Sequence, residues 1–539
     1  MQSPGQSNDL GSYEQVLKAL SISQRGSYAD LSYMPVFRAS AIFYAVCGLH
    51  TNTCVGFLNY WREKNGVDGI GVLVTLRDAQ GIKKLRQHAH LTAATQLLNV
   101  RDLLEDAGLA SSEFTGSIEV EFFSAEDLKF QFPGVSVFYQ TPGGISYVHT
   151  NQRVYNHAED QARGSALNAW QTGFDVLADQ GAFVFLVNGP VAFEGGAARI
   201  VAISAHGDSR SAEITLPAIA PYGVYNWHPS SVTGLVEFMG PAPGICKLDL
   251  PLDGIHLRLG AGHLVPSDQP AKQWLSITHS FFDATSTEDY FDTSQLAPDV
   301  FPAFIPFVLP AELDLDLVLY PIYSPCSMQL SLVGYSDLGA RLFALDAGTY
   351  QTPEDGIRRL NIRELLAKEE LPSDCSLYVL RFDPLGGHQL PNRITYGLNF
   401  HKGERLGTNI SASAYIARSW GMGQRSWKWG AVALNDGATN QIMVSAFRNA
   451  GEAGEAGDAM TAAGTFSIYD SQGVVASTQF ALKDGTARTF TAEALLAQAR
   501  YSSKVDSILW YVVESPQSWL DVVGVTISAQ GNVGGDHSF

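Results

Sequence analysis

Three stretches of this chain share one pattern: an apolar residue, a helix-capping residue, and a short amphipathic run that ends in a leucine pair or its equivalent. A capping residue before such a run predicts the first turn of a helix. Each stretch lies between segments rich in β-branched and aromatic residues, which favour strands. We therefore expect a tandem array of one β-rich domain type that carries a short helix. The stretches are residues 98–104, 360–366 and 490–496.

The spacing of a second feature supports the repeat. A turn-like segment, residues 78–81, precedes the first helical stretch, and residues 470–473 precede the last. Asp78 lies 21 residues before Asn99, and Asp470 lies 21 residues before Thr491. The middle copy has its turn at residues 336–339, with a small insertion before its helix, and insertions of that size belong in loops. Two features in one register indicate that the repeat extends beyond the helix.

The helices are predicted to be short, and short helices are marginal without tertiary packing. Their leucines are therefore predicted to pack on the sheets as core residues, in keeping with how often leucine is buried. These residues are Leu103, Leu104, Leu365, Leu366, Leu495 and Leu496.

Between the helices the hydrophobic pattern has a period of two, and Gly, Asn, Asp and Pro bound the apolar runs, as expected for sandwich strands. The predicted fold class is mostly β, with tandem immunoglobulin-like β-sandwich domains. Each domain except the second is expected to carry one short helix. In the helix position of the second stand residues 221–229, whose prolines and glycine favour a loop.

Four domains and a tail account for the chain. We expect an N-terminal tail or arm at residues 1–32 and sandwich units at 33–160, 173–283, 300–405 and 420–539, the second being a divergent copy. The joints contain aromatic residues, which a flexible linker would avoid. They are therefore predicted to pack against neighbouring domains. The aromatic residues are Trp170, Phe282, Tyr290, Phe291, Tyr415 and Trp420.

The net charge of the chain limits the classes of partner that it is expected to bind. The net charge is −19, so binding to a phosphate backbone is disfavoured and nucleic acid is not expected as a partner. Charged residues make up 17% of the chain, against about 25% in typical soluble proteins. A polar but weakly charged surface suits packing against other protein subunits or copies of the chain itself, and glycan is a further candidate partner.

No run of apolar residues approaches the 18 or more that span a bilayer, so no transmembrane segment is predicted. The N-terminus lacks a basic segment followed by an apolar one, as a signal peptide would have. These features favour a cytoplasmic location, with the cell surface or the exterior, reached by non-classical export, as the alternative. Five scattered cysteines fit a reducing compartment slightly better.

Two clusters raise the question of metal binding or acid/base chemistry. Cys47, His50 and Cys54 could supply soft metal ligands, but ordinary strand-edge residues are the favoured interpretation because free cysteine is so often buried. Asp314 and Asp316 should line one face of a strand together with Glu312. A solvated sheet face, with the intervening leucines turned inward, is preferred over a cation site or a catalytic pair. No metal and no cofactor is predicted.

Histidines recur where units end, and this place favours a structural role such as bonding a loop carbonyl. They are His149, His279, His401 and His537. The second unit departs most from its siblings and holds the candidate ligand-binding residues, whose aromatic rings could stack on a sugar although sandwich aromatics usually lie in the core. These candidates are Tyr225, Trp227, His228, His256, His263, Trp274 and His279.

The standard catalytic sequence signatures are missing, so no catalytic residue is assigned. The favoured function is a non-catalytic structural or interaction module in a protein assembly or a glycan-facing surface layer. The alternative is a carbohydrate-active enzyme with its site in the second unit or at a domain joint.

Overall fold

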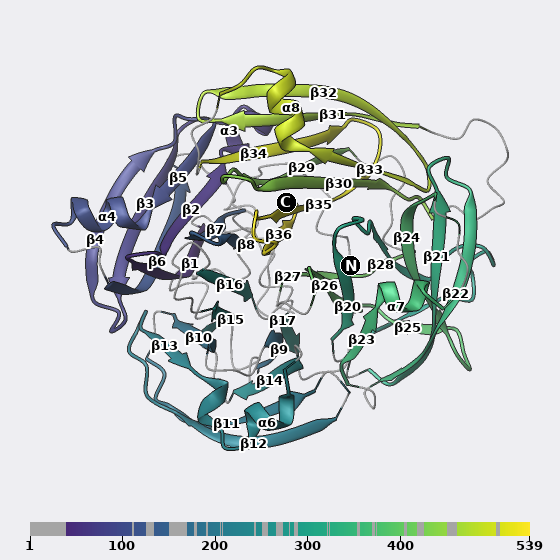
Figure 1. Ribbon diagram of the computed structural model, residues 1–539, viewed down its shortest axis with the longest axis horizontal. Coiled ribbons are helices and arrows are strands. Elements are labelled where there is room, and N and C mark those ends of the chain that lie inside the picture. The colour runs from purple at the N-terminus through teal and green to yellow at the C-terminus, as the bar shows by residue number, and fades with distance from the viewer. Residues whose placement is uncertain are drawn as a thin grey trace, which may run out of the picture. The chain divides into compact units, whose positions relative to one another are not determined.

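The computed structural model describes most of the chain from residue 39 onward (Figure 1). The predicted tail at residues 1–32, together with Trp420 and His256, lies outside the described residues. The other segments outside are 33–38, 110–112, 125–133, 150–169, 177–180, 190–191, 205, 207, 242–243, 251–255, 266–272, 280, 285–288, 321, 323, 353–355, 369–371, 373, 404–406, 418–419, 421–424, 450–460 and 503–506.

The structure is mostly β, and its sheets form tandem sandwiches with one repeated strand order. In the first sandwich one sheet has the order β1-β6-β3-β4 and the other β5-β2-β7-β8. Counted from its own first strand, each of the other three sandwiches has these same two orders, with one extra edge strand, β17 or β28, in the second and third. The repeat that the helical stretches predicted therefore extends to the whole strand topology.

The strand bounds follow in chain order. The first sandwich has β1 (Ala39–Gly48), β2 (Asn52–Leu58), β3 (Ile70–Asp78), β4 (Lys83–His90), β5 (Thr95–Asn99), β6 (Glu113–Ser124), β7 (Ser136–Thr141) and β8 (Gly144–His149). The second has β9 (Trp170–Val176), β10 (Ala182–Asn188), β11 (Gly196–Ile203), β12 (Ser209–Leu216), β13 (Val224–Trp227), β14 (Gly244–Leu250), β15 (Leu257–Val265), β16 (Trp274–His279) and β17 (Phe281–Ala284).

The third sandwich has β19 (Ala303–Phe307), β20 (Asp314–Leu319), β21 (Cys326–Ser336), β22 (Arg341–Thr352), β23 (Arg358–Asn361), β24 (Cys375–Pro384), β26 (Thr395–His401), β27 (Thr408–Ser413) and β28 (Tyr415–Ile416). The fourth has β29 (Ser426–Ala433), β30 (Thr439–Ala446), β31 (Thr461–Asp470), β32 (Gly473–Lys483), β33 (Thr486–Thr491), β34 (Ile508–Ser515), β35 (Asp521–Ile527) and β36 (Val533–His537). A small two-stranded sheet joins β18 (Tyr290–Asp292) to β25 (Gln389–Pro391).

The finer label, immunoglobulin-like, is not confirmed. In the immunoglobulin order the first two strands pair within one sheet. Here the first and second strands of every sandwich lie in different sheets, as β1 and β2 do. The chain crosses between sheets directly after β1 and after β29, over residues 49–51 and 434–438.

The three predicted helices form where the capping residues stand. They are α4 (Val100–Asp106), α7 (Ile362–Leu366) and α8 (Ala492–Gln498). Asn99 accepts a hydrogen bond from the backbone N–H of Arg101, and Asn361 accepts one from Glu364. These bonds satisfy donors that a helix start would otherwise leave open.

The second sandwich was expected to lack a helix, and that detail is wrong. A 3₁₀ turn, η2 (Pro229–Ser231), and a short helix, α6 (Leu235–Met239), follow β13. The loop predicted at residues 221–229 is therefore only partly observed, because β13 occupies residues 224–227 and the 3₁₀ turn begins at Pro229. The helix α6 starts later, after Gly234 in the left-handed conformation. The first sandwich also has an additional helix, α3 (Tyr60–Asn65). No helix in the described part of the chain has the length and apolarity needed to span a bilayer.

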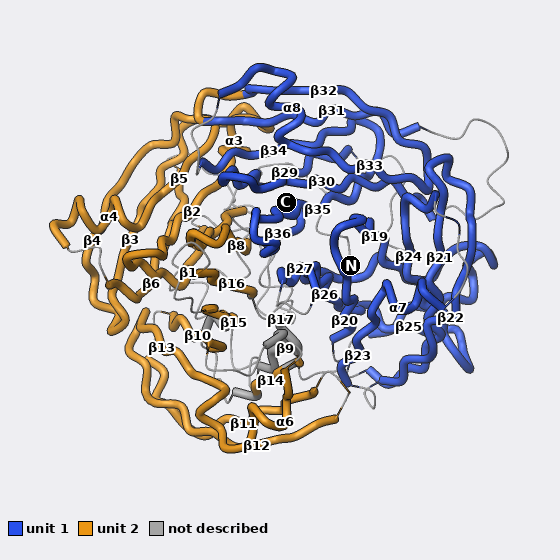
Figure 2. Tube along the Cα trace, in the orientation of Figure 1, with its two compact units in different colours: residues 1, 285–470, 474–539 blue, residues 2–284, 471–473 orange. Residues whose placement is uncertain are grey.

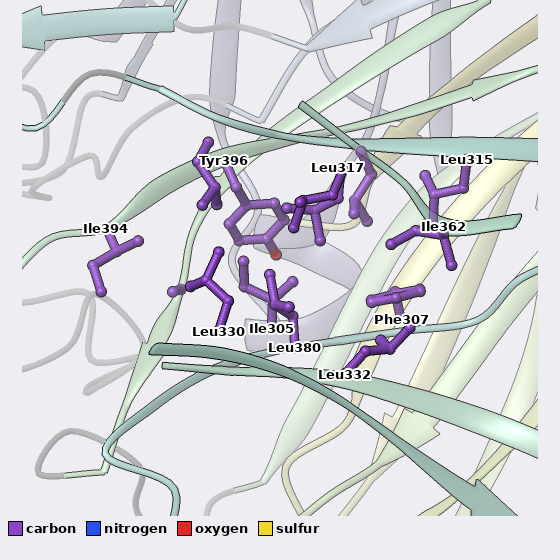
Figure 3. Packing of buried hydrophobic residues seen from close by; sticks show 14 of the residues in the cluster. Ile305, Phe307, Leu315, Leu317, Leu330, Leu332, Ile362, Leu380, Ile394 and Tyr396 are labelled. Carbon is purple, nitrogen blue, oxygen red and sulfur yellow. The ribbon is translucent and has the colours of Figure 1, made fainter. Parts of the chain in front are cut away.

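Both sheets of a sandwich contribute to its core. In the third, Ile305 and Leu380 from one sheet point toward Leu317 from the other (Figure 3). The predicted core role is confirmed for Leu103, Leu104, Leu495 and Leu496, which are buried. Leu365 and Leu366 are only partly buried, because Ile362 is the fully buried residue of α7 and the leucines pack at the edge of the cluster.

The described chain falls into two compact units, each holding two sandwiches (Figure 2). One unit comprises residues 285–470 and 474–539, and the other residues 2–284 and 471–473. Within the first of these, the hydrophobic cluster of the third sandwich continues into the fourth through Met443, Val525 and Val533. The boundaries of the four predicted domains stay a prediction, since the sandwiches of a unit share apolar contacts.

A core truncation tests whether two sandwiches of one unit fold together. Leu104→Ala removes a side chain that is 1% exposed and should destabilise the first sandwich by about 2–5 kcal/mol. We expect β10 of the second sandwich to lose amide protection at the same lowered urea concentration as β3, measured by hydrogen exchange and mass spectrometry. Leu97→Ala, at a side chain 39% exposed in the same sandwich, is the matched control. A shift confined to β3 would contradict shared folding.

Candidate functional site: the joints between sandwiches

The same turn joins the two sandwiches in both units. In the first sandwich it connects β3 to β4, and the Asp78 carboxylate accepts backbone N–H bonds from Gln80 at 3.0 Å and Ile82 at 2.9 Å. In the third it connects β21 to β22, and the Ser336 hydroxyl accepts bonds from Leu338 and Ala340, both at 3.2 Å. A short polar side chain thus fixes each turn from within. We call residues 78–81 and 336–339 the docking turns.

A glycine lets each docking turn approach the neighbouring sandwich at backbone distance. Gly81 has φ +78°, and a Cβ there would lie 2.1 Å from the carbonyl oxygen of Pro221. Gly339 has φ +81°, and a Cβ there would lie 2.2 Å from the carbonyl oxygen of Asp484. Both partners lie in the connection between the fourth and fifth strands of the next sandwich. The two joints are therefore built by equivalent elements.

In the unit that contains residues 2–284, the joint between the two sandwiches is polar and aromatic. The Val224 N–H donates to the Ala79 carbonyl at 2.9 Å. Arg77 places its guanidinium 3.9 Å from the centre of the Tyr222 ring and forms an ion pair of 2.7 Å with Glu119. Arg77 and Glu119 are 8% and 2% exposed. Both members of the pair lie in the first sandwich, so the contact of the Arg77 guanidinium with the Tyr222 ring is the one that crosses the joint.

Aromatic packing extends this joint along β10. The Tyr44 ring of β1 stacks on Phe185 with centroids 4.8 Å apart and also contacts Phe183. The Asn226 amide donates to the Tyr44 hydroxyl at 3.1 Å. Phe183 and Phe185 lie against Gly262 and Gly260 of β15, where a Cβ would overlap each ring. The two phenylalanines thus stand on the outer face of their sheet and meet the first sandwich.

The other unit uses apolar groups at the equivalent place. Val333 and Val379 of the third sandwich form a buried cluster with Phe447 of the fourth, and Tyr335 contacts the Phe447 ring. Asn449 closes the joint by accepting from the Phe301 N–H at 2.6 Å and donating to the Phe301 carbonyl at 2.8 Å. The predicted packing of the joints is therefore observed for the described part of this unit.

A partly buried charged group sits beside this second joint. The Tyr415 hydroxyl donates to Asp521 at 3.0 Å, and the Lys428 ammonium lies 4.6 Å from the centre of the Trp519 ring. Burial raises the pKa of Asp521, against the hydrogen bond from Tyr415 and the charge of Lys428, and burial lowers the pKa of Lys428. Tyr415, one of the aromatics predicted to pack at a joint, thus links β28 to the fourth sandwich.

A cavity of about 10 Å³ lies next to Asp521, with room for roughly one water molecule. It is too small for a sugar ring. Its lining residues are Phe307, Val308, Leu398, Phe400, Met443, Ser445, Asp521 and Val523.

For the predicted carboxylate row, the inward-facing leucines are confirmed and the fully solvated acidic face is not. Leu313, Leu315 and Leu317 turn into the core, which confirms the inward face. The acidic face is not simply solvated, since Asp316 is 8% exposed and pairs with Arg359 at 3.0 Å and His401 at 3.3 Å. Other residues of this face are also bonded: Asp314 pairs with Arg363, and Glu312 accepts from Gln441. Asn361, the cap of α7, donates to Asp316 at 2.9 Å.

The first sandwich has a neutral version of this polar patch. Strand register puts Gln140 across from Asn52, just as His401 lies across from Asp314. The Asn52 amide donates to the helix cap Asn99 at 3.0 Å and to Gln140 at 3.3 Å. In both sandwiches the patch therefore ties a helix cap to the sheet.

The cysteine cluster has the structural role that was favoured. Cys47 and Cys54 form no disulfide and are each 1% exposed, and Cys54 donates to Gln140 at 3.3 Å. Burial, with the nearby Asp102 charge, raises the pKa of Cys54 to about 12. Cys47 and Cys54 thus lie buried in β1 and β2 as strand residues, in keeping with the favoured interpretation.

The terminal histidines behave as predicted wherever their bonds are described. His401 Nδ1 lies 2.6 Å from the Gly403 carbonyl, and His537 Nδ1 lies 3.0 Å from that of Ser538. His149 is buried. For His279 only the strand position is described, across from Gly260 in β15.

The candidate ligand-binding residues of the second sandwich divide into two groups. Trp227 and Trp274 are 5% and 3% exposed, so their rings pack inside and offer no stacking face. Tyr225 is partly buried against the same core as Trp227. His228 is exposed and bonds the Ala182 carbonyl at 3.2 Å, and the buried His263 lies across from Ala182. The structure thus brings these two histidines near one strand end, and a ligand-binding role for the set stays a prediction.

Comparison with known proteins gives no family. No family model and no curated protein matches the chain. Among solved structures, a tetra-tandem repeat from the extending region of a large adhesion protein matches at 11% identity and a TM-score of 0.10, covering 87% of this chain and 91% of that one. Native E. coli alpha-2-macroglobulin matches at 11% identity and a TM-score of 0.08, covering 91% and 28%. Likenesses at these TM-scores carry no argument about function.

Substitution of a docking glycine should open a joint. Gly81→Ala combines about 1–2 kcal/mol of left-handed backbone strain with the overlap on Pro221. Gly108→Ala is the control, because Gly108 has φ +69° and a Cβ there meets nothing within 4 Å. We expect Gly81→Ala to lower the urea stability of its unit by at least about 2 kcal/mol more than the control. Equal losses would show that the close approach is not needed.

The charged patch of the third sandwich should make stability depend on pH. Burial lowers the pKa of His401, but the hydrogen bond and charge of Asp316 outweigh it and raise that pKa above 6.5. Burial raises the pKa of Asp316, but His401 and Arg359 bring it below 3.8. The His401 contribution is full below pH 6.5 and is lost as pH rises through the raised pKa. The Asp316 contribution is full above pH 3.8 and is lost on acidification.

His401→Gln installs the side chain that the first sandwich has at this position. We expect it to cost about 1 kcal/mol at pH 5.5 and much less at pH 9, by urea unfolding. His388→Gln, at an exposed histidine of the same sandwich, should leave both values unchanged. A pH-independent loss would contradict the assigned ion pair.

Proposed function

We propose that this chain is a non-catalytic structural or interaction module that supplies rigid β-sandwich pairs to a protein assembly or a glycan-facing surface layer. The observation that carries the proposal is the repeated joint. Gly81 and Gly339 seat equivalent turns on equivalent loops of the next sandwich, at a distance that only a glycine permits. A joint of this kind holds two sandwiches in a fixed relation rather than linking them loosely.

The chemistry of the joints supports this proposal. The Arg77 guanidinium and the Asp521 carboxylate each contact an aromatic residue of the neighbouring sandwich, Tyr222 and Tyr415. The described cavity beside Asp521 has room for about one water molecule, which favours packing over substrate binding at that place. Partners are therefore expected at the outer surfaces of the pairs, and they would be copies of this chain, other protein subunits or glycans.

Light scattering and a glycan array test this function together. A structural or interaction module should form oligomers between about 1 and 100 μM protein, or bind defined glycans, while its sandwiches stay folded. A chain unfolded in urea is the control, since its binding would reflect sequence alone. A monodisperse monomer that binds no glycan would contradict the proposal.

A further inference from the structure

The edge strand β32 of the fourth sandwich differs from its equivalents in the other sandwiches. Each of β4, β12, β22 and β32 ends its sheet and hydrogen-bonds to one neighbour in the part of the chain that the structure describes. Edge strands offer unpaired backbone groups to other strands, and proteins commonly protect them with charged side chains or bulges. The four edges can therefore be compared for protection.

Three of the edges are protected by charge. Strand β4 carries Lys83, Lys84 and Arg86, β12 carries Arg210 and Glu213, and β22 carries Arg341 and Asp346. The pairings of β4 and β22 with their neighbours also contain register shifts. Both devices disfavour pairing with a further strand.

Strand β32 has neither charge nor proline for ten residues. It runs from Gly473 to Leu482 with no ionisable side chain, and Lys483 ends it. Phe480 and Leu482 are buried in the core of the fourth sandwich, so the strand is anchored. Ser477, Gln479 and Ala481 alternate with these residues and are exposed. The edge is therefore long, uncharged from Gly473 to Leu482, and anchored to its own sheet and core.

We propose that β32 pairs antiparallel with β32 of a second copy of this chain, which joins the two four-stranded sheets across a two-fold axis. This inference rests on the proposed function and names its partner. Main-chain hydrogen bonds supply the affinity in strand addition of this kind. Two-fold pairing places identical surfaces in contact, as most homodimers do.

Charge selects this edge for self-pairing. Two chains that each carry a net charge of −19 repel one another, so a self-association surface must avoid acidic groups. β32 contains none, whereas β12 and β22 contain Glu213 and Asp346. Strand β4 also lacks acidic residues, but its Lys83, Lys84 and Arg86 would repel those of a second copy. A centred antiparallel pairing also brings Lys483 of each copy to the Gly473 end of the other, so the two ammonium groups lie at opposite ends of the pairing and do not repel each other closely.

A charged edge tests the pairing in the full chain. The double variant Ser477→Lys/Gln479→Lys changes two exposed side chains and gives β32 the protection that β4 has. The matched control is Thr349→Lys/Gln351→Lys, the same change at exposed positions of β22. Both variants lower the net negative charge equally, so general repulsion falls in each.

Sedimentation equilibrium should show a native dimer of twice 58.3 kDa at tens of micromolar. The β32 variant should raise the dimer dissociation constant at least tenfold, while the β22 variant leaves it unchanged. Hydrogen exchange of the native chain should also show β32 amides gaining protection as concentration rises. A chain that stays at 58.3 kDa up to 100 μM, or equal association of all three proteins, would overturn the pairing.

The outcomes separate this inference from the proposed function. If the β32 variant still associates, the contact between copies lies elsewhere, and the proposed function as a structural module is not contradicted. A native monomer that binds glycans removes self-pairing and likewise leaves the module. A native monomer that binds none removes both.

Discussion

The close backbone approach at the docking turns is the constraint on which the rest of the architecture depends. A β-sandwich buries its core between its own two sheets and has no need of a neighbour. What couples these sandwiches is a turn that places Gly81 against Pro221, and Gly339 against Asp484, with no room for a side chain. Once the turn is seated, the outer face of one sheet meets the next sandwich, and that face becomes interior.

The two units satisfy this constraint with different chemistry. Where one has the buried pair Arg77–Glu119 under Tyr222, the other has Val333, Val379 and Phe447. The ion pair itself lies within the first sandwich, and the contact of Arg77 with the Tyr222 ring is the part of this arrangement that crosses the joint. The polar patches beneath the helix caps vary in the same way, with Gln140 in one sandwich and His401 in another. The architecture is thus kept while the contacts change.

Features encoded within a few residues could be predicted from the sequence, and features made by distant residues could not. The caps Asn99 and Asn361 and the alternating leucines around Asp316 are local patterns, and the structure has them. The docking turns were visible as turns through their spacing, but their partners lie more than a hundred residues away. No hydrophobic period in the sequence predicts that Arg77 contacts Tyr222.

The second sandwich shows the same limit from another side. A loop was expected over residues 221–229, but strand β13 lies within that range, and α6 was missed because it does not follow its strand directly as α4, α7 and α8 do. Trp227 was a candidate for stacking on a sugar because its side chain is aromatic, but it is a buried core residue. The sequence of a four-residue strand does not show which side chains point inward.

Pulling single molecules from both ends with optical tweezers tests most directly whether the sandwich pair is the rigid unit. If the joints couple the sandwiches, unfolding should release two steps of about 250 residues, roughly 90 nm each at about 3.6 Å per residue. Four steps of about half that length, with no pairing in time, would show that each sandwich unfolds alone and would contradict the account.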